Sequence, residues 1–117
     1  MMKKLLVEVG EICDKEYARA NEQYPAFASD HEGHDVLREE IDETGEALST
    51  VFEVNTDMER AIRKNDAAAV RKMAMKIYDE ALNTAAEAIQ TAAMAQKLIK
   101  SQDLRKEKKW IPPCMLV

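Results

Sequence analysis

The chain has 117 residues, a formal net charge of −5, and 46% hydrophobic but only 5% aromatic residues. This length suits one domain with a modest core, which association between chains could enlarge. The acidic balance argues against polymeric nucleic acid as a partner, because surfaces that coat it carry an excess of Lys and Arg. Three Gly and three Pro, beside abundant Ala, Glu, Lys and Met, are typical of an all-α protein.

The two cysteines indicate a reducing compartment. Cys13 and Cys114 lie near opposite termini, without CxxC spacing or a neighbouring His, so neither a zinc site nor a redox motif is expected. Glu8 and Glu11 interrupt the first apolar run too early for a secretory signal, and no stretch is long and apolar enough to span a membrane. We therefore expect a cytoplasmic protein with no membrane partner.

Apolar side chains at helical spacing predict a first helix over about residues 3–21. It should end before Tyr24-Pro25, since proline disfavours helix in the residue that precedes it. The loop that follows leads directly into an acidic segment. Either Ser29 or Asp30 can cap the next helix by accepting a hydrogen bond from a free amide of its first turn.

A second helix is expected over about residues 34–64, and it carries charge on its apolar side. Its apolar stripe consists of Leu37, Ile41, Thr44, Leu48 and Val51. Glu40 falls inside this stripe and Glu43 lies one turn further on, so two carboxylates flank the apolar seam. Such a pair favours a bound cation. The alternative is a solvated acidic face near a helix start, where the macrodipole favours Glu and Asp.

After Asn65-Asp66, which provides a break and a cap, a third helix is expected over about residues 67–101. One of its stripes is made of small residues suited to close helix packing: Val70, Ala74, Ile77, Ala81, Ala85, Ala88, Ala92, Ala95 and Ile99. Glu80 and Glu87 interrupt the neighbouring apolar stripe, as Glu40 does in the second helix. The second and third helices therefore both carry glutamates within an apolar stripe.

These helices are expected to form one domain over residues 1–104. Residues 105–117 are basic at first and then apolar, and Pro112-Pro113 cannot continue a helix. Trp110 and its apolar neighbours are suited to docking, so we expect this C-terminal tail to pack on a neighbour.

The carboxylates suggest phosphate chemistry that depends on magnesium. Glu40 and Glu43 on one helix, and Glu87 with Glu80 or Gln90 on the other, could supply the oxygen ligands that Mg²⁺ prefers. Such a metal neutralises phosphoryl charge and lowers the pKa of a bound water. No Ser/His/Asp or Cys/His arrangement offers a covalent nucleophile. A di-iron centre normally needs Glu-x-x-His on two helices, and no His follows these glutamates at that spacing.

Two blocks of the sequence resemble the MazG-like nucleotide pyrophosphohydrolases, especially the small phage-type members. FASDHEGH, from Phe27 to His34, and LREEIDE, from Leu37 to Glu43, are similar to the FxSxHEGxxxxxEExxE segment of that family. The block EAIQTAAMAQK, which begins at Glu87, resembles a later helix that carries ExxD in the larger family. The resemblance implies an all-α NTP pyrophosphatase helical bundle, its four-helix core completed by oligomerisation as a homodimer or homotetramer. It also implies hydrolysis of a nucleoside triphosphate, NTP or dNTP, to the monophosphate and pyrophosphate.

By position, the resemblance assigns a role to each acidic residue of these blocks. Glu40 and Glu43 match the metal ligands of ExxE, and Glu39 is the leading Glu of EExxE. The implied cofactor is Mg²⁺, with Mn²⁺ as a substitute. The expected metal ligands are Glu40, Glu43, Glu87 and Gln90, and the residue expected to assist the attacking water is Glu39 or Glu80.

Gln90 stands where the family carries Asp, and this departure defines the alternative function. An amide coordinates a metal through its oxygen but brings no charge and cannot act as a base. A second frame, Glu80-Ala-Leu-Asn83, also lacks the final Asp. The alternative is a catalytically degenerate helical-bundle protein of the same descent that serves in binding or assembly. Lys97, about 15 Å along the helix from Glu87, would contact phosphate only if a partner helix brought substrate there, and is otherwise expected to be solvated.

Overall fold

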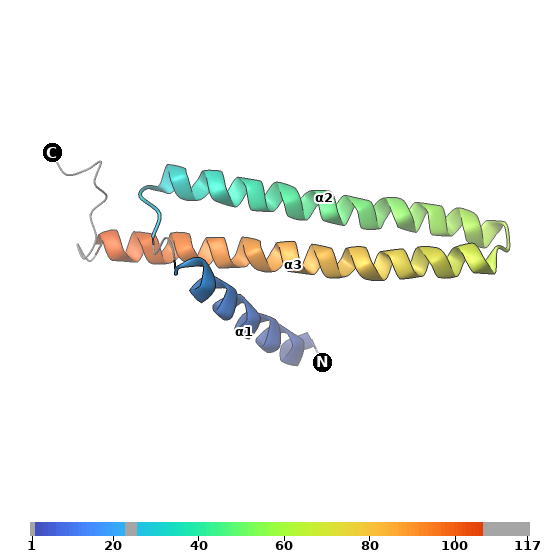
Figure 1. The fold of residues 1–117 in the computed structure, drawn as a ribbon, viewed down its shortest axis with the longest axis horizontal. Coiled ribbons are helices and arrows are strands. Elements are labelled where there is room, and N and C mark those ends of the chain that lie inside the picture. The colour runs from blue at the N-terminus through green and yellow to red at the C-terminus, as the bar shows by residue number, and fades with distance from the viewer. Residues whose placement is uncertain (1, 23–25, 107–117) are drawn as a thin grey trace. The chain divides into compact units, whose positions relative to one another are not determined.

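The computed structural model describes residues 2–22 and 26–106. Within these ranges the protein consists of three helices without a strand, which confirms the all-α class (Figure 1). The helices are α1 (Met2–Ala20), α2 (Asp30–Arg63) and α3 (Ala67–Lys106). Helix α1 ends within about one residue of the end expected near residue 21. Tyr24-Pro25, Cys114, and the tail from residue 107 onward with Trp110 lie outside the described residues. Residue contacts divide the chain into two compact units, Met1–Glu40 with Ile89–Val117, and Ile41–Ala88.

Helix α2 begins at Asp30, so the expected start near residue 34 was wrong by about one turn. The reason is Ser29, whose Oγ accepts a hydrogen bond of 3.1 Å from the backbone amide of Glu32. Of the two caps that the sequence offered, Ser29 is therefore the one used. Asp30 and Glu32 then place negative charge in the first turn, where the helix dipole favours it.

The core of the first unit forms around Phe27, which is 3% exposed. Ala93 and Met94 of α3 are buried with Phe27, and partly buried neighbours surround them: Tyr17, Ala20, Val36, Leu37 and Leu98. The backbone amide of Phe27 donates a hydrogen bond of 2.8 Å to Oγ of the fully buried Ser101. The Ser101 hydroxyl in turn donates to the carbonyl of Lys97 over 2.7 Å. The segment before α2 is thus tied to α3 by packing and by hydrogen bonds.

Helix α3 runs to Lys106, so Arg105 and Lys106 belong to the helix and not to a tail. Arg105 pairs with Asp30 over 2.5 Å and donates to the carbonyl of Ala28 over 3.4 Å, while the Gln102 amide donates to Asp30 over 3.3 Å. The bond from Arg105, followed by that from Gln102, lowers the pKa of Asp30. The last turns of α3 therefore hold the first turn of α2.

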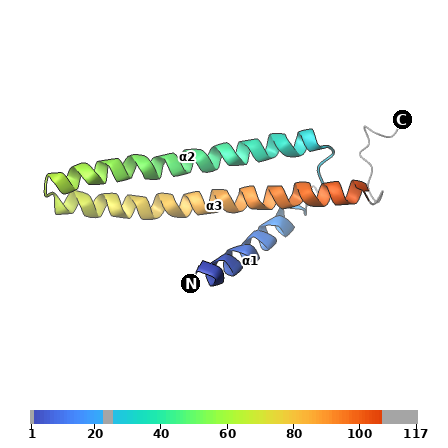
Figure 2. The same ribbon diagram turned by 180° about the vertical axis from the view of Figure 1, so that it is seen from behind.

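The second unit is an antiparallel hairpin of the later part of α2 and the earlier part of α3, which lie side by side in both views (Figures 1 and 2). Asn65 has a φ of 55°, and its amide donates to the carbonyl of Ile62. The Asp66 amide donates to the carbonyl of Ala61, and this hydrogen bond closes the end of α2. Oδ1 of Asp66 accepts a hydrogen bond of 3.0 Å from the amide of Ala69 and so caps α3. The break and cap expected at Asn65-Asp66 are confirmed.

Each helix of the hairpin covers only a narrow stripe of the other. In the part of α2 that belongs to the second unit, the buried residues are Ala47, Val54 and Ala61, which recur every seven residues. Ile41 and Leu48, placed in the buried stripe by the sequence, are 54% and 43% exposed, so that assignment was wrong for the single chain. With one neighbouring helix, the side chains beside the central stripe stay in water.

The two stripes that the sequence predicts on α3 differ in their exposure to solvent. In the second unit, Glu80 and Glu87 are half-buried, as expected for glutamates that lie within an apolar stripe. The stripe of small residues is largely outward, with Ala81, Ala85 and Ala88 exposed. The close helix packing that these alanines predict is therefore not made within one chain.

The sequence also led us to expect no membrane-spanning segment and reduced cysteines. No helix among the described residues has both the length and the apolarity needed to cross a membrane. Cys13 is a free, half-buried thiol. The cytoplasmic location itself stays a prediction.

Candidate metal centre

Two carboxyl groups of the second unit are in direct contact. Glu43 of α2 and Glu87 of α3 share a side-chain hydrogen bond, and carboxylate oxygens of the two lie within 4.8 Å of each other. The hydrogen bond with Glu87, and then its negative charge, raise the pKa of Glu43. Glu43 therefore holds its proton more tightly than an isolated glutamate does.

Glu40 extends this arrangement along α2. It lies one helical turn before Glu43, and its side chain is half-buried, as the sequence stripe predicted. The carboxylate oxygens of Glu40 and Glu43 also lie within 4.8 Å of each other. Glu43 is thus the carboxylate close to each of the other two, and three of the four expected ligands contribute oxygens around it.

A shallow, open cleft of about 270 Å³ borders the pair. Its lining residues are Glu43, Glu46, Ala47, Thr50, Glu80, Asn83 and Glu87. Four of these are carboxylates, and neither Lys nor Arg is among them, so the cleft suits a cation better than a bare anion. Glu80, expected to assist a water, lines the cleft, whereas Glu39 belongs to the first unit and is exposed.

Glu46 was missed as a cleft residue in the sequence. It follows Glu43 by three residues, as Glu43 follows Glu40, so the i, i+3, i+6 spacing could have identified it. Asn83, the last residue of the alternative frame, also lines the cleft. Both side chains offer oxygen atoms at its edge.

Gln90, the fourth expected ligand, has a partner in the first unit. Its Nε2 donates a hydrogen bond of 2.5 Å to Oε1 of Glu16, and Glu16 also pairs with Arg19 over 2.5 Å. The bond from Arg19, and then that from Gln90, lower the pKa of Glu16. Spacing within α1 indicates the pair of Glu16 and Arg19, but only the fold brings Gln90 to it. A ligand role for Gln90 stays a prediction.

Lys97 is buried, which corrects the expectation of a solvated lysine. Only 6% of the residue is exposed, and its Nζ lies 4.7 Å from the centroid of the Phe27 ring. Burial lowers the pKa of Lys97, and the negative charge of Glu32 opposes this effect. The aromatic face stabilises the ammonium group where water is largely excluded.

No protein-family model matches the chain, and neither a curated protein nor a solved structure matches it. The resemblance to MazG-like proteins is carried by its two sequence blocks. Three residues of the first block have structural roles here: Phe27 fills the core, Ser29 caps α2, and Gly33 allows close approach. A Cβ at Gly33 would lie 2.6 Å from Cδ1 of Leu98.

Proposed function

We propose that the protein is a magnesium-dependent nucleoside triphosphate pyrophosphohydrolase, which converts an NTP or dNTP to the monophosphate and pyrophosphate. The observation that carries this proposal is the contact between the carboxyl groups of Glu43 and Glu87. Two ionised carboxylates at this separation repel each other, and a shared proton relieves the repulsion. A divalent cation would relieve it more fully, because it compensates both charges at once.

The residues present fit a magnesium ion in number and chemistry. Glu40, Glu43 and Glu87 would hold it, which leaves coordination positions for waters and for phosphate oxygens of the substrate. Bound there, the ion supplies charge neutralisation at the phosphoryl group and a water of lowered pKa. Glu80, on the same cleft, is suited to accept the proton of that water, and Glu39 is the second candidate for this role.

A second function is favoured by one specific observation. The nitrogen of Gln90 donates to Glu16, and Gln90 replaces a residue that would have brought a charge to the metal. These facts support a catalytically degenerate helical bundle of the same descent that binds a ligand or assembles with a partner. In that protein the acidic cleft could still bind a cation without hydrolysis.

We also propose that association of copies, as a homodimer or homotetramer, completes a four-helix core. Large apolar side chains on both helices of the second unit support this: Ile41, Leu48, Phe52, Met75, Tyr78 and Leu82 are each at least 43% exposed. Large apolar side chains left exposed in this number on two neighbouring helices are expected of an interface. The outward alanines of α3 would let a second helix approach closely.

The test is to incubate the protein with a panel of NTPs and dNTPs, with Mg²⁺ or Mn²⁺, and to measure pyrophosphate and monophosphate. Glu43→Gln should abolish both products, whereas Glu53→Gln, an exposed change on the same helix, should not. Calorimetric titration of Mg²⁺ without nucleotide separates the two functions. Metal binding without hydrolysis across the panel would favour the degenerate protein, and absence of both would refute the proposed metal centre.

A further inference from the structure

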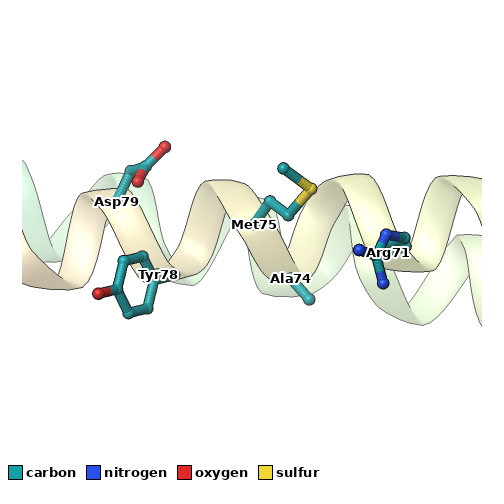
Figure 3. A pocket seen from close by; sticks show the side chains of 5 residues that line it. All are labelled: Arg71, Ala74, Met75, Tyr78 and Asp79. Atoms are coloured by element: carbon teal, nitrogen blue, oxygen red, sulfur yellow. The ribbon is translucent and has the colours of Figure 1, made fainter.

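One face of α3 in the second unit carries exposed apolar side chains between two opposite charges. Arg71, Ala74, Met75, Tyr78 and Asp79 line a shallow groove of about 490 Å³ along the helix (Figure 3). Met75 is 60% exposed and Tyr78 is 66% exposed. Figure 3 shows Met75 and Asp79 projecting from one edge of the helix and Ala74 and Tyr78 from the other. All five side chains belong to α3, so the groove is open to a partner.

The charges of this face are arranged symmetrically about Met75. Arg71 precedes Met75 by four residues and Asp79 follows it by four, so all three lie on one side of the helix. A second copy of α3 that crosses in the antiparallel direction at Met75 would place Arg71 opposite Asp79 on both sides of the crossing. A parallel copy in the same register would instead oppose Arg71 to Arg71 and Asp79 to Asp79, which is repulsive.

We propose that two copies of the chain associate through this face of α3, antiparallel, with the two-fold axis passing beside Met75. Such an interface is isologous, and each contact away from the axis therefore occurs twice. The same register places Tyr78 opposite the partner's Lys72, where the ring face can stabilise an ammonium group. This register sets Leu82, which is 56% exposed, opposite the small side chain of Ala68.

This pairing rests on the association of copies proposed above, for which it names an interface, but it does not depend on the proposed hydrolase activity. All of its residues lie on α3 between Ala68 and Leu82, and none of them lines the acidic cleft. The oligomeric state can be measured without nucleotide or metal. A failure of this interface is therefore distinguishable from a failure of the proposed hydrolase activity, and chains that associate without the expected cross-link would refute the interface alone.

Cross-linking of single cysteines tests the direction and the register. In a full-length background with Cys13→Ser and Cys114→Ser, oxidation of Met75→Cys should give a disulfide-linked dimer, because the two sulfurs meet at the axis. Ala68→Cys is the matched control on the same face. In the antiparallel register its two copies are about 21 Å apart, beyond the reach of a disulfide. Cross-linking of both variants would indicate a parallel pair. Cross-linking of neither variant would indicate that the chains do not pair through this face. Either result overturns the proposal.

Charge reversal tests the two ion pairs. Asp79→Arg should weaken self-association at least about tenfold in sedimentation equilibrium, because both pairs become repulsive. The double variant Arg71→Asp with Asp79→Arg should restore the wild-type constant, since each pair is only inverted. Asp14→Arg, the same change on an exposed position of α1, should leave the constant unchanged. A monomeric wild type, or no restoration in the double variant, contradicts the proposed register.

Discussion

The amide nitrogen of Gln90 donates to Oε1 of Glu16 over 2.5 Å and thereby joins α3 to α1 inside the first unit. Glu16 is also paired with Arg19, so its carboxylate is held from two helices. The residue that departs from the expected Asp thus has a structural partner that an Asp could not keep. An aspartate at this position would present a second carboxylate to Glu16 and no donor.

We therefore expect Gln90→Asp to lower the free energy of unfolding by about 1.5 kcal/mol or more, the usual cost of losing a hydrogen bond to a charged group. Adding Glu16→Gln should recover most of this loss, because a neutral amide can donate to the new carboxylate. Urea unfolding of the two single variants and the double variant measures the coupling. Additive effects would show that the contact between the two residues carries no energy.

Removal of single carboxylates tests the ligand set. Glu40→Gln and Glu87→Gln should each reduce pyrophosphate release at least about a hundredfold, because each removes a charged oxygen ligand. Circular dichroism should show unchanged helicity, since neither side chain is proposed to act through packing. An unaltered rate in Glu87→Gln would shift the site toward Glu80, the other carboxylate of α3 on the same cleft.

The contact between Glu43 and Glu87 predicts a dependence of stability on pH without metal. Because the pKa of Glu43 is raised, its contribution is fully present below the ordinary value of 4.5 and is lost as pH rises through the raised pKa. Glu43→Gln should abolish this loss and be the more stable protein at neutral pH. Urea unfolding against pH in metal-free buffer measures the difference. Parallel profiles for wild type and variant would contradict the shared proton.

Ser101 supplies the partner of a buried backbone amide, so its hydroxyl should contribute to stability. Ser101→Ala leaves the amide of Phe27 without that partner, and we expect a loss of about 1–3 kcal/mol. Ser49→Ala, an exposed change within α2, should stay within about 0.5 kcal/mol of wild type. Chemical denaturation compares the two variants. Equal effects would mean that the buried hydrogen bond is replaced at no cost.

Gly33 and Gly45 are both helical but differ in their surroundings. A Cβ at Gly45 would meet nothing within 4 Å, so Gly45→Ala should stabilise the protein by up to about 1 kcal/mol through helix propensity. The same change at Gly33 places the Cβ against Leu98 and Phe27, and we expect the repacking to cancel this gain. In a Leu98→Ala background the cost at Gly33 should disappear. Thermal unfolding of the wild type, the three single variants and the Gly33→Ala, Leu98→Ala double variant measures these differences.

Periodicity alone was sufficient to predict three helices, the break at Asn65-Asp66 and the inward position of Glu87, because these depend on neighbours in sequence. Periodicity wrongly predicted that Ile41 and Leu48 are buried within one chain, because an apolar stripe does not reveal how many helices cover it. The burial of Lys97 depends on Phe27, which is distant in sequence.

The acidic cleft and the exposed groove on α3 could not be predicted from the sequence and are seen only in the folded structure. Their lining residues can be recognised by type, but the distances between side chains from different helices require the turn geometry. The resemblance to MazG-like proteins singles out Glu40, Glu43 and Glu87 as ligands, and oxygens of these three carboxylates lie within 4.8 Å of one another. The contact of Glu43 with Glu87 is a cross-helix relationship that helical spacing combined with the turn position could have suggested.

The turn at Asn65 sets the register of the acidic cleft. Glu43 and Glu87 are equally far from Asn65 along the chain, 22 residues in each direction, and Thr50 and Glu80 are likewise each 15 residues away. In an antiparallel hairpin, residues equidistant from the turn stand level with each other. Inserting one residue into a single arm would turn everything beyond it by about 100° and separate the carboxyl pair. Equal insertions in both arms would keep the two residues level, but they would preserve the pair only where each insertion amounts to whole helical turns, such as about seven residues.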